Sequence, residues 1–200
     1  MRGPVDRLTS SLPAPWATAV DWIVTIAVAV AAVLAIKQWV VNPYRIPTSS
    51  MEPTLHCAEP GAGCESSFSD RVLANRFIYH FKDPERGDIV VFETPPRVER
   101  VCSGGGDVFV KRLVGLPGEV VEWRNGSVFI DGERLREPYV SDANHDTDTG
   151  RQDLGRDQYF FMGDNRIDSC DSREWGPVPG ENLIGPVFAV YWPPQRIGFR

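Results

Sequence analysis

Residues 118–132 read GEVVEWRNGSVFIDG and contain the clearest fold signal in the chain. Asn125-Gly126 separates two short apolar runs, 119–123 and 127–130, and Asp131-Gly132 closes the second run. Asn-Gly and Asp-Gly dipeptides tolerate the positive φ angles that two-residue hairpin turns require. The stretch therefore predicts consecutive β-strands joined by tight turns.

The chain beyond residue 42 continues this pattern. Further apolar runs occur at 72–80, 88–93, 107–114, 158–162 and 184–192. Seventeen prolines and eighteen glycines punctuate the sequence, and we find no convincing helical periodicity after residue 42. We therefore predict a mainly β fold for this part.

One long apolar segment precedes the β region. Residues 22–36 are uncharged, and the segment extends back to residue 17 past a single Asp21. A bilayer span needs about 20 apolar residues, so 17–36 is predicted to be a transmembrane anchor helix. The alternatives are a cleaved signal peptide and a buried core helix, but residues 37–41 (KQWVV) do not look like a cleavage site. Tryptophans suited to the membrane interfaces flank the segment: Trp16, Trp22 and Trp39.

Composition argues against one class of partner and points to one unusual residue type. The net charge is −6 and no basic stripe is present, so we expect no nucleic-acid partner. Of the 21 basic residues only Lys37, Lys82 and Lys111 are lysines. Basic residues are nearly balanced on the two flanks of the apolar segment, so charge does not set its orientation.

The four cysteines bear on the compartment. Cys57 and Cys64 enclose a short loop that contains Pro and Gly, and we slightly favour a disulfide there over two free thiols. Such a bridge would indicate an oxidising compartment. Whether Cys102 pairs with Cys170 stays open.

A candidate nucleophile follows the apolar segment closely. Thirteen residues separate Ile36 from Ser50, in a position suited to a substrate presented at the bilayer surface. Pro47 and Pro53 indicate a stiff segment around Ser50, although a helix N-cap at residues 48–52 is an alternative. A serine at its ordinary pKa is a poor nucleophile and needs a neighbouring base.

Lys111 is the candidate base. On a strand over 107–114, Lys111 shares a face with Phe109 and Leu113, and an apolar setting lowers the pKa of an ammonium group. Arginine could not serve, because a guanidinium stays protonated. An ordinary surface lysine at a strand edge is the alternative.

Two other chemistries are less favoured. A Ser-His-Asp triad would use His56, His80 or His145, but no Gly-x-Ser-x-Gly elbow surrounds any serine. A metal centre lacks clustered ligands, and the acidic loop 141–153 misses the spacing of a calcium-binding EF-hand. We therefore expect no metal and no cofactor.

Four ordered segments resemble the conserved boxes of type I bacterial signal peptidases. They are 46–55 (IPTSSMEPTL), 87–92 (GDIVVF), 111–119 (KRLVGLPGE) and 163–173 (GDNRIDSCDSR). The resemblance implies an antiparallel β-sheet catalytic domain and a Ser-Lys endopeptidase that removes signal peptides from secreted preproteins after Ala-x-Ala. Such enzymes work through an acyl-enzyme intermediate.

The resemblance also implies roles for individual residues. Ser50 would be the nucleophile and Lys111 the general base. The Ser50 amide and the Thr48 hydroxyl would stabilise the oxyanion, and Ser169 would orient the lysine. Ion-pairing residues would hold the site together: Asp164, Asp171 and Arg173. Shallow substrate pockets would be lined by Ile46, Pro47, Met51, Leu55, Phe109 and Val110.

The family further implies a topology. Residues 1–16 would be cytoplasmic, 17–36 would cross the plasma membrane once, and 37–200 would form the extracytoplasmic catalytic domain. Preprotein signal peptides and the lipid bilayer would be the partners. The departures from the family are modest. Ile167-Asp168 stands where Asp-Asn is usual, so local ion pairing is expected to differ, and Thr48 replaces the commoner serine while keeping the hydroxyl.

Two other functions are weighed against this one. A related Ser-Lys protease that cleaves itself or a regulator would be soluble, which the apolar segment disfavours. A catalytically inactive, membrane-tethered β module that binds peptides is disfavoured by the complete set of Ser50, Lys111 and Ser169.

Overall fold

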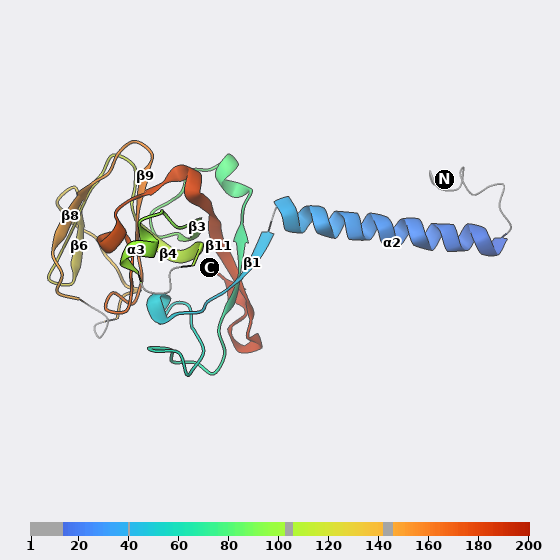
Figure 1. Ribbon diagram of the computed structural model, residues 1–200, viewed down its shortest axis with the longest axis horizontal. Coiled ribbons are helices and arrows are strands. Elements are labelled where there is room, and N and C mark those ends of the chain that lie inside the picture. Colours follow the sequence, from blue (N-terminus) through green and yellow to red (C-terminus); the bar gives the residue numbers. More distant parts are fainter. Residues whose placement is uncertain (1–13, 40, 103–105, 142–145) are drawn as a thin grey trace. The chain divides into compact units, whose positions relative to one another are not determined.

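The chain divides into two compact units, residues 1–41 and 42–200. The computed structural model describes residues 14–39, 41–102, 106–141 and 146–200. Most of the predicted segment 1–16 therefore lies outside the described residues. The first unit contains the helix α2 (Ala14–Trp39), whose Trp22 side chain is 66% exposed (Figure 1). Within the described ranges, no helix is both long enough and apolar enough to cross a membrane.

The second unit is built mainly from two antiparallel sheets, which confirms the mainly β prediction (Figure 1). The larger sheet has the strand order β1-β2-β11-β3-β4-β9-β10, with β12 paired to β11. Its strands are β1 (Val41–Arg45), β2 (Arg71–Asn75), β3 (Ile89–Glu93), β4 (Val108–Gly115), β9 (Gln158–Met162), β10 (Val178–Pro179), β11 (Leu183–Trp192) and β12 (Gly198–Phe199). Two four-residue helices, α3 (Val98–Val101) and α4 (Ser172–Trp175), lie between strands in the chain.

The smaller sheet contains the predicted hairpins. Its order is β7-β6-β5-β8, where the strands are β5 (Val120–Arg124), β6 (Ser127–Ile130), β7 (Glu133–Arg134) and β8 (Gly150–Asp153). Asn125 and Gly126 have φ angles of 49° and 71°, and Asp131 and Gly132 have 50° and 86°. Both turns thus use the positive φ values that their dipeptides permit, which confirms the prediction.

The larger sheet separates two apolar cores. One contains Val91 and Met51, and the other contains Phe92 and Leu113. Because side chains alternate along a strand, Phe109 packs against the second core and Val110 against the first. The predicted face shared by Lys111, Phe109 and Leu113 therefore exists on β4.

One predicted run is only partly a strand. The run 72–80 leaves strand geometry after Asn75, whose side-chain oxygen accepts hydrogen bonds from the amides of Phe77 (3.0 Å) and Ile78 (3.2 Å). A 3-10 turn, η2 (Ile78–His80), follows. The correction has a local cause, because an Asn side chain that bonds the backbone just beyond it competes with strand pairing.

Candidate active site

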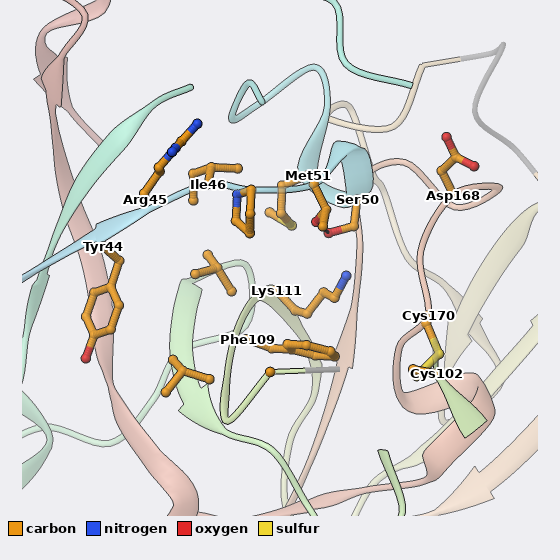
Figure 2. A pocket seen from close by; sticks show the side chains of 15 residues that line it. Tyr44, Arg45, Ile46, Ser50, Met51, Cys102, Phe109, Lys111, Asp168 and Cys170 are labelled. Carbon is orange, nitrogen blue, oxygen red and sulfur yellow. Dashed lines mark hydrogen bonds between the residues drawn. A yellow bond between two sulfur atoms is a disulfide. The ribbon is translucent and has the colours of Figure 1, made fainter. Parts of the chain in front are cut away.

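Three separate segments of the second unit line a cavity of about 330 Å³ (Figure 2). The first runs from β1 into the 3-10 turn η1 (Ser49–Met51). The second comprises Cys102, Gly106 and the beginning of β4. The third belongs to the loop after β9 and includes Asp168 and Cys170. Ser50 and Lys111 both line the cavity, and Figure 2 shows their polar ends pointing toward one another.

Ser50 is held by its backbone. It is 7% exposed, and its carbonyl accepts a hydrogen bond from the Asn165 amide at 3.1 Å. The Asn165 side chain also donates to the Ser49 carbonyl at 3.3 Å. Thr48 occupies the N-cap position of η1 in extended conformation but makes no capping bond; its hydroxyl lies 3.3 Å from that of Ser50. The helix-cap alternative is therefore wrong, because the Thr48 side chain makes no capping hydrogen bond, although a short 3-10 turn does begin at Ser49.

Lys111 is buried, with only 4% of its surface exposed. Its amine donates to the Ser169 hydroxyl at 3.0 Å and lies 5.6 Å from the centre of the Phe109 ring. Burial lowers the pKa of Lys111 from 10.5 to about 8, while Asp171 opposes the shift and Arg173 adds to it. The alternative of an exposed edge lysine is therefore wrong.

Asp171 interacts electrostatically with this amine and is fully buried. Arg173 binds it through two hydrogen bonds of 2.8 Å, and the Gly163 amide donates a third at 3.0 Å. Arg173 also donates to the Ser169 carbonyl at 3.2 Å. Arg173 also pairs with Asp146, so one guanidinium serves two carboxylates. These contacts fix the loop that carries Ser169.

Asp164 belongs to a different cluster. Its carboxylate accepts hydrogen bonds from Arg112 at 2.7 and 2.6 Å and from the Thr54 hydroxyl at 2.5 Å. Arg112 donates in addition to the Gly87 carbonyl at 2.7 Å. This cluster ties the nucleophile segment, β4 and the loop after β9 together, and none of its hydrogen bonds reaches Ser50 or Lys111.

Sequence reasoning missed two residues of this architecture, Arg112 and Asn165. Arg112 directly follows Lys111 in the sequence, and nothing in the pattern indicated that it pairs with a residue fifty-two positions away. Asn165 follows Asp164 in the GDN segment, which was the available signal. Gly163 is also required, because a Cβ there would lie 2.3 Å from the Ser169 hydroxyl and 2.4 Å from the Ser50 carbonyl oxygen.

Five of the six predicted pocket residues line the cavity: Ile46, Pro47, Met51, Phe109 and Val110. Leu55 does not. It is 0% exposed, packs in the first core with Met51, and donates its amide to the Met51 carbonyl at 2.8 Å. Its place is corrected to a support beneath the pocket, because the turn after Met51 directs Leu55 into the core.

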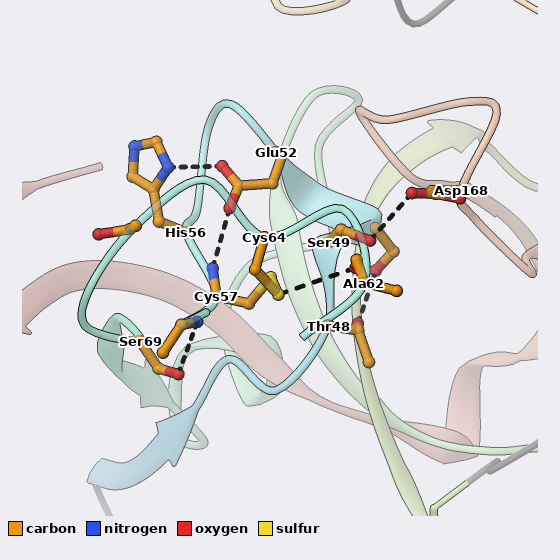
Figure 3. The surroundings of a disulfide bond; sticks show 12 residues. Thr48, Ser49, Glu52, His56, Cys57, Ala62, Cys64, Ser69 and Asp168 are labelled. Atoms are coloured by element: carbon orange, nitrogen blue, oxygen red, sulfur yellow. Dashed lines mark hydrogen bonds and ion pairs between the residues drawn. A yellow bond between two sulfur atoms is a disulfide. The ribbon is translucent and has the colours of Figure 1, made fainter. Parts of the chain in front are cut away.

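Both cysteine pairs are bonded. Cys57–Cys64 closes the short loop as predicted, and Cys102–Cys170, which sequence left open, joins the end of α3 to the loop after β9. Figure 3 shows the first loop beside the nucleophile turn. Gly63 of that loop lies so close to Ser49 that a Cβ would be 2.8 Å from its hydroxyl.

The histidines do not form a triad with Ser50. His56 pairs with Glu52, and neither His56 nor His80 lines the cavity. His145 lies outside the described residues. Across the described residues, no group of three or more His, Cys, Asp or Glu side chains is placed to hold a metal ion.

Comparisons with known proteins agree over most of the chain. The family model for signal peptidase, peptidase S26, matches residues 19–192. Signal peptidase I of Leptolyngbya laminosa is 34% identical over 195 residues, which covers 98% of this chain and 90% of that protein. Probable signal peptidase I-2 of Synechocystis sp. is 37% identical over 174 residues, which covers 87% and 73%. A crystal structure of a signal peptidase I from Enterococcus faecalis is 33% identical and covers 52% of this chain and 97% of its own, with a TM-score of 0.44.

Proposed function

Because the chain belongs to the signal peptidase family, peptidase S26, and removes signal peptides from preproteins, we propose that Ser50 is its nucleophile and Lys111 its general base. One observation carries this proposal. A buried amine with a pKa of about 8 points toward a serine hydroxyl across a peptide-sized cavity (Figure 2). At pH 8 about half of such an amine is neutral and able to accept a proton.

The proposed acylation uses these two residues in turn. The Ser50 oxygen attacks the scissile carbonyl carbon while its proton passes to the Lys111 amine. The C–N bond of the resulting tetrahedral intermediate breaks, and the Lys111 ammonium returns the proton to the leaving amine. Water attacks the acyl-enzyme in the second half, again with Lys111 as base, which frees the Ser50 hydroxyl and releases the signal peptide carboxylate.

Two groups are proposed to stabilise the oxyanion. The Ser50 amide belongs to the turn η1, which Asn165 holds through the Ser49 and Ser50 carbonyls. The Thr48 hydroxyl lies close enough to the Ser50 oxygen to reach the same reacting centre. Fixed donors aimed at developing charge lower the barrier, because they need no reorganisation during the reaction.

The Lys111 environment supports its role as a neutral base. Ser169 offers the amine a neutral hydrogen-bond acceptor, which fixes its direction without adding a full negative charge. Asp171 would stabilise the ammonium form, but Arg173 binds that carboxylate directly. Ser169 is thus proposed to orient Lys111, and Asp171 with Arg173 to hold the loop that carries Ser169.

The cavity wall supports a preference for small side chains before the cut. Ile46, Pro47, Met51, Phe109 and Val110 present a largely apolar surface at the Ser50 end of β1. A shallow apolar pocket admits the methyl group of alanine, which suits Ala-x-Ala. Since β1 is an edge strand of the larger sheet, we propose that the substrate binds as an added extended strand.

We propose also that residues 17–36 anchor the enzyme in the plasma membrane, with residues 1–16 cytoplasmic and 37–200 extracytoplasmic. The uncharged run 22–36 and the family support this topology. The full chain should stay with membranes during alkaline extraction, and Val28→Asp with Leu34→Asp should release it. Release of the unaltered chain into the soluble fraction would refute the anchor.

A single assay tests the central proposal. The full chain in detergent should cleave a preprotein after Ala-x-Ala, and Ser50→Ala should abolish cleavage while the melting temperature stays unchanged. Binding of the preprotein without cleavage by the unaltered protein would instead favour a peptide-binding module. Retention of full activity by Ser50→Ala would show that another residue is the nucleophile.

A further inference from the structure

A single carboxylate faces the cavity at its Ser50 end. Of the described residues that line the cavity, Asp168 is the sole acidic one, and its side chain is exposed. Figure 2 shows Asp168 on the far side of Ser50 from Tyr44, Arg45 and Ile46. The cavity therefore has its acidic group on one side of Ser50, whereas the opposite side carries Ile46 and the cation Arg45.

The Asp168 carboxylate is held in place without a cationic partner among the described residues. It accepts a hydrogen bond from the Ser49 hydroxyl at 3.3 Å (Figure 3). Gly63 of the disulfide-closed loop packs against it so closely that a Cβ there would lie 2.3 Å from the carboxylate oxygen. No ion pair among the described residues includes Asp168. Its charge is thus available to a bound molecule.

Asp168 also acts separately from the base. The charged groups that shift the pKa of Lys111 are Asp171, Arg173 and Asp164, and Asp168 is not among them. Removal of the Asp168 charge should therefore leave the pKa of Lys111 unchanged. An effect of Asp168 on turnover would instead come through the substrate.

We propose that Asp168 selects preproteins by the charge of the residues that directly follow the scissile bond, favouring Lys or Arg there and disfavouring Asp or Glu. This inference rests on the proposed function. The apolar wall formed by Ile46, Phe109 and Val110 takes up the residues before the cut, so the chain leaving Ser50 on the opposite side passes Asp168. An exposed ion pair changes an equilibrium by about two- to fivefold, and attraction of Lys combined with repulsion of Glu predicts about a tenfold ratio.

The test compares preproteins that are identical except for Lys, Gln or Glu in the first two positions after the cut. For the unaltered enzyme, kcat/KM should fall in the order Lys, Gln, Glu, with about a tenfold ratio between the extremes that shrinks at high salt. Asp168→Asn keeps an oxygen for the Ser49 hydroxyl and should bring this ratio close to one. Asp168→Lys should reverse the order.

Two controls separate a charge effect at the site from other causes. Glu133→Gln removes an exposed carboxylate on β7, outside the cavity wall, and should leave the tenfold ratio intact. The pH midpoint of kcat/KM should be the same in Asp168→Asn and in the unaltered enzyme. A ratio that persists in Asp168→Asn, or an unaltered enzyme indifferent to charge, would overturn the inference while leaving the proposed function standing. Failure to cleave even the Gln preprotein would overturn both.

Discussion

Lys111 and Arg112 are neighbours on β4 and both are buried, yet the two sides of the strand treat positive charge in opposite ways. Lys111 lies over Phe109 and donates to a neutral hydroxyl, that of Ser169. Arg112 makes two hydrogen bonds to the carboxylate of Asp164. One strand thus places a cation that can lose its charge beside a cation that keeps it.

The difference lies in the side-chain type and in the partner that each side provides. A guanidinium stays protonated in proteins, and Asp164 in direct contact offsets the cost of burying the Arg112 charge. An ammonium group can lose its proton when it is buried without such a contact. On the Lys111 side the nearest buried carboxylate, Asp171, is already bound by Arg173. The Lys111 side is therefore the one proposed to serve catalysis, while the hydrogen bonds of Arg112 hold three segments together.

The largest effect is expected from a mutation on the Lys111 side of β4. Lys111→Arg should lower kcat/KM by about 10⁴-fold or more, because a guanidinium stays protonated and cannot act as base. Preprotein cleavage in detergent measures this loss. Lys82→Arg, the same change at an exposed lysine, is the matched control and should leave activity unaltered. A Lys111→Arg enzyme with a tenth of normal activity would refute the dyad.

The next largest effect is expected from a mutation on the Arg112 side of β4. Asp164→Asn leaves a buried guanidinium without its counter-charge and should lower the free energy of unfolding by about 3–5 kcal/mol. Denaturant unfolding of the full chain in detergent measures it. Glu122→Gln disrupts an exposed pair with Arg151 and should change stability little. Unchanged stability in Asp164→Asn would contradict the cohesive role assigned to the Arg112 side.

A smaller effect concerns the direction of the Lys111 amine. Ser169→Ala should reduce kcat/KM by about 100-fold, as misplacement of a catalytic group does. It should also move the pH midpoint downward, because the lost hydroxyl oxygen accepts from the ammonium and so favours the protonated form. Ser172→Ala is the control, because the Ser172 hydroxyl accepts a hydrogen bond from the Phe161 amide. Its loss should lower stability without moving the pH midpoint of activity. An unmoved midpoint in Ser169→Ala would contradict an orienting role.

The smallest effect requires no mutation. The pKa of Lys111 is lowered to about 8, and the base must be neutral, so kcat/KM should rise with pH through that value. Between pH 7 and pH 9 the neutral fraction, and with it kcat/KM, increases about tenfold. A pH series in constant ionic strength measures the profile. A profile that is flat or falls over this range would show that the unprotonated amine does not limit turnover.

Local sequence signals predicted much of this molecule. The Asn125-Gly126 turn and the alternation around Lys111 depend only on neighbouring residues, and both were predicted correctly. The run 72–80 failed where the Asn75 side chain redirected the backbone. Leu55 was misplaced because motif position does not reveal which way a turn sends a side chain.

Long-range pairings were beyond such signals. The Arg112–Asp164 and Cys102–Cys170 contacts depend on β9 lying beside β4, and strand periodicity does not encode strand order. The charge partners on each side of β4 follow from the same sheet order. Sequence therefore indicated which residues could do chemistry, whereas the fold decided which charges they meet.

Gly163 has a consequence for how this enzyme can vary. Gly163 lies against both the Ser50 carbonyl and the Ser169 hydroxyl, and there is no room there for even one methyl group. A side chain there would push the nucleophile segment and the lysine-orienting loop apart together, so no compensating change on one side restores both. In a saturation library selected for secretion, we expect this position to tolerate nothing but glycine, while Gly132, which has open space around it, loses only its turn geometry.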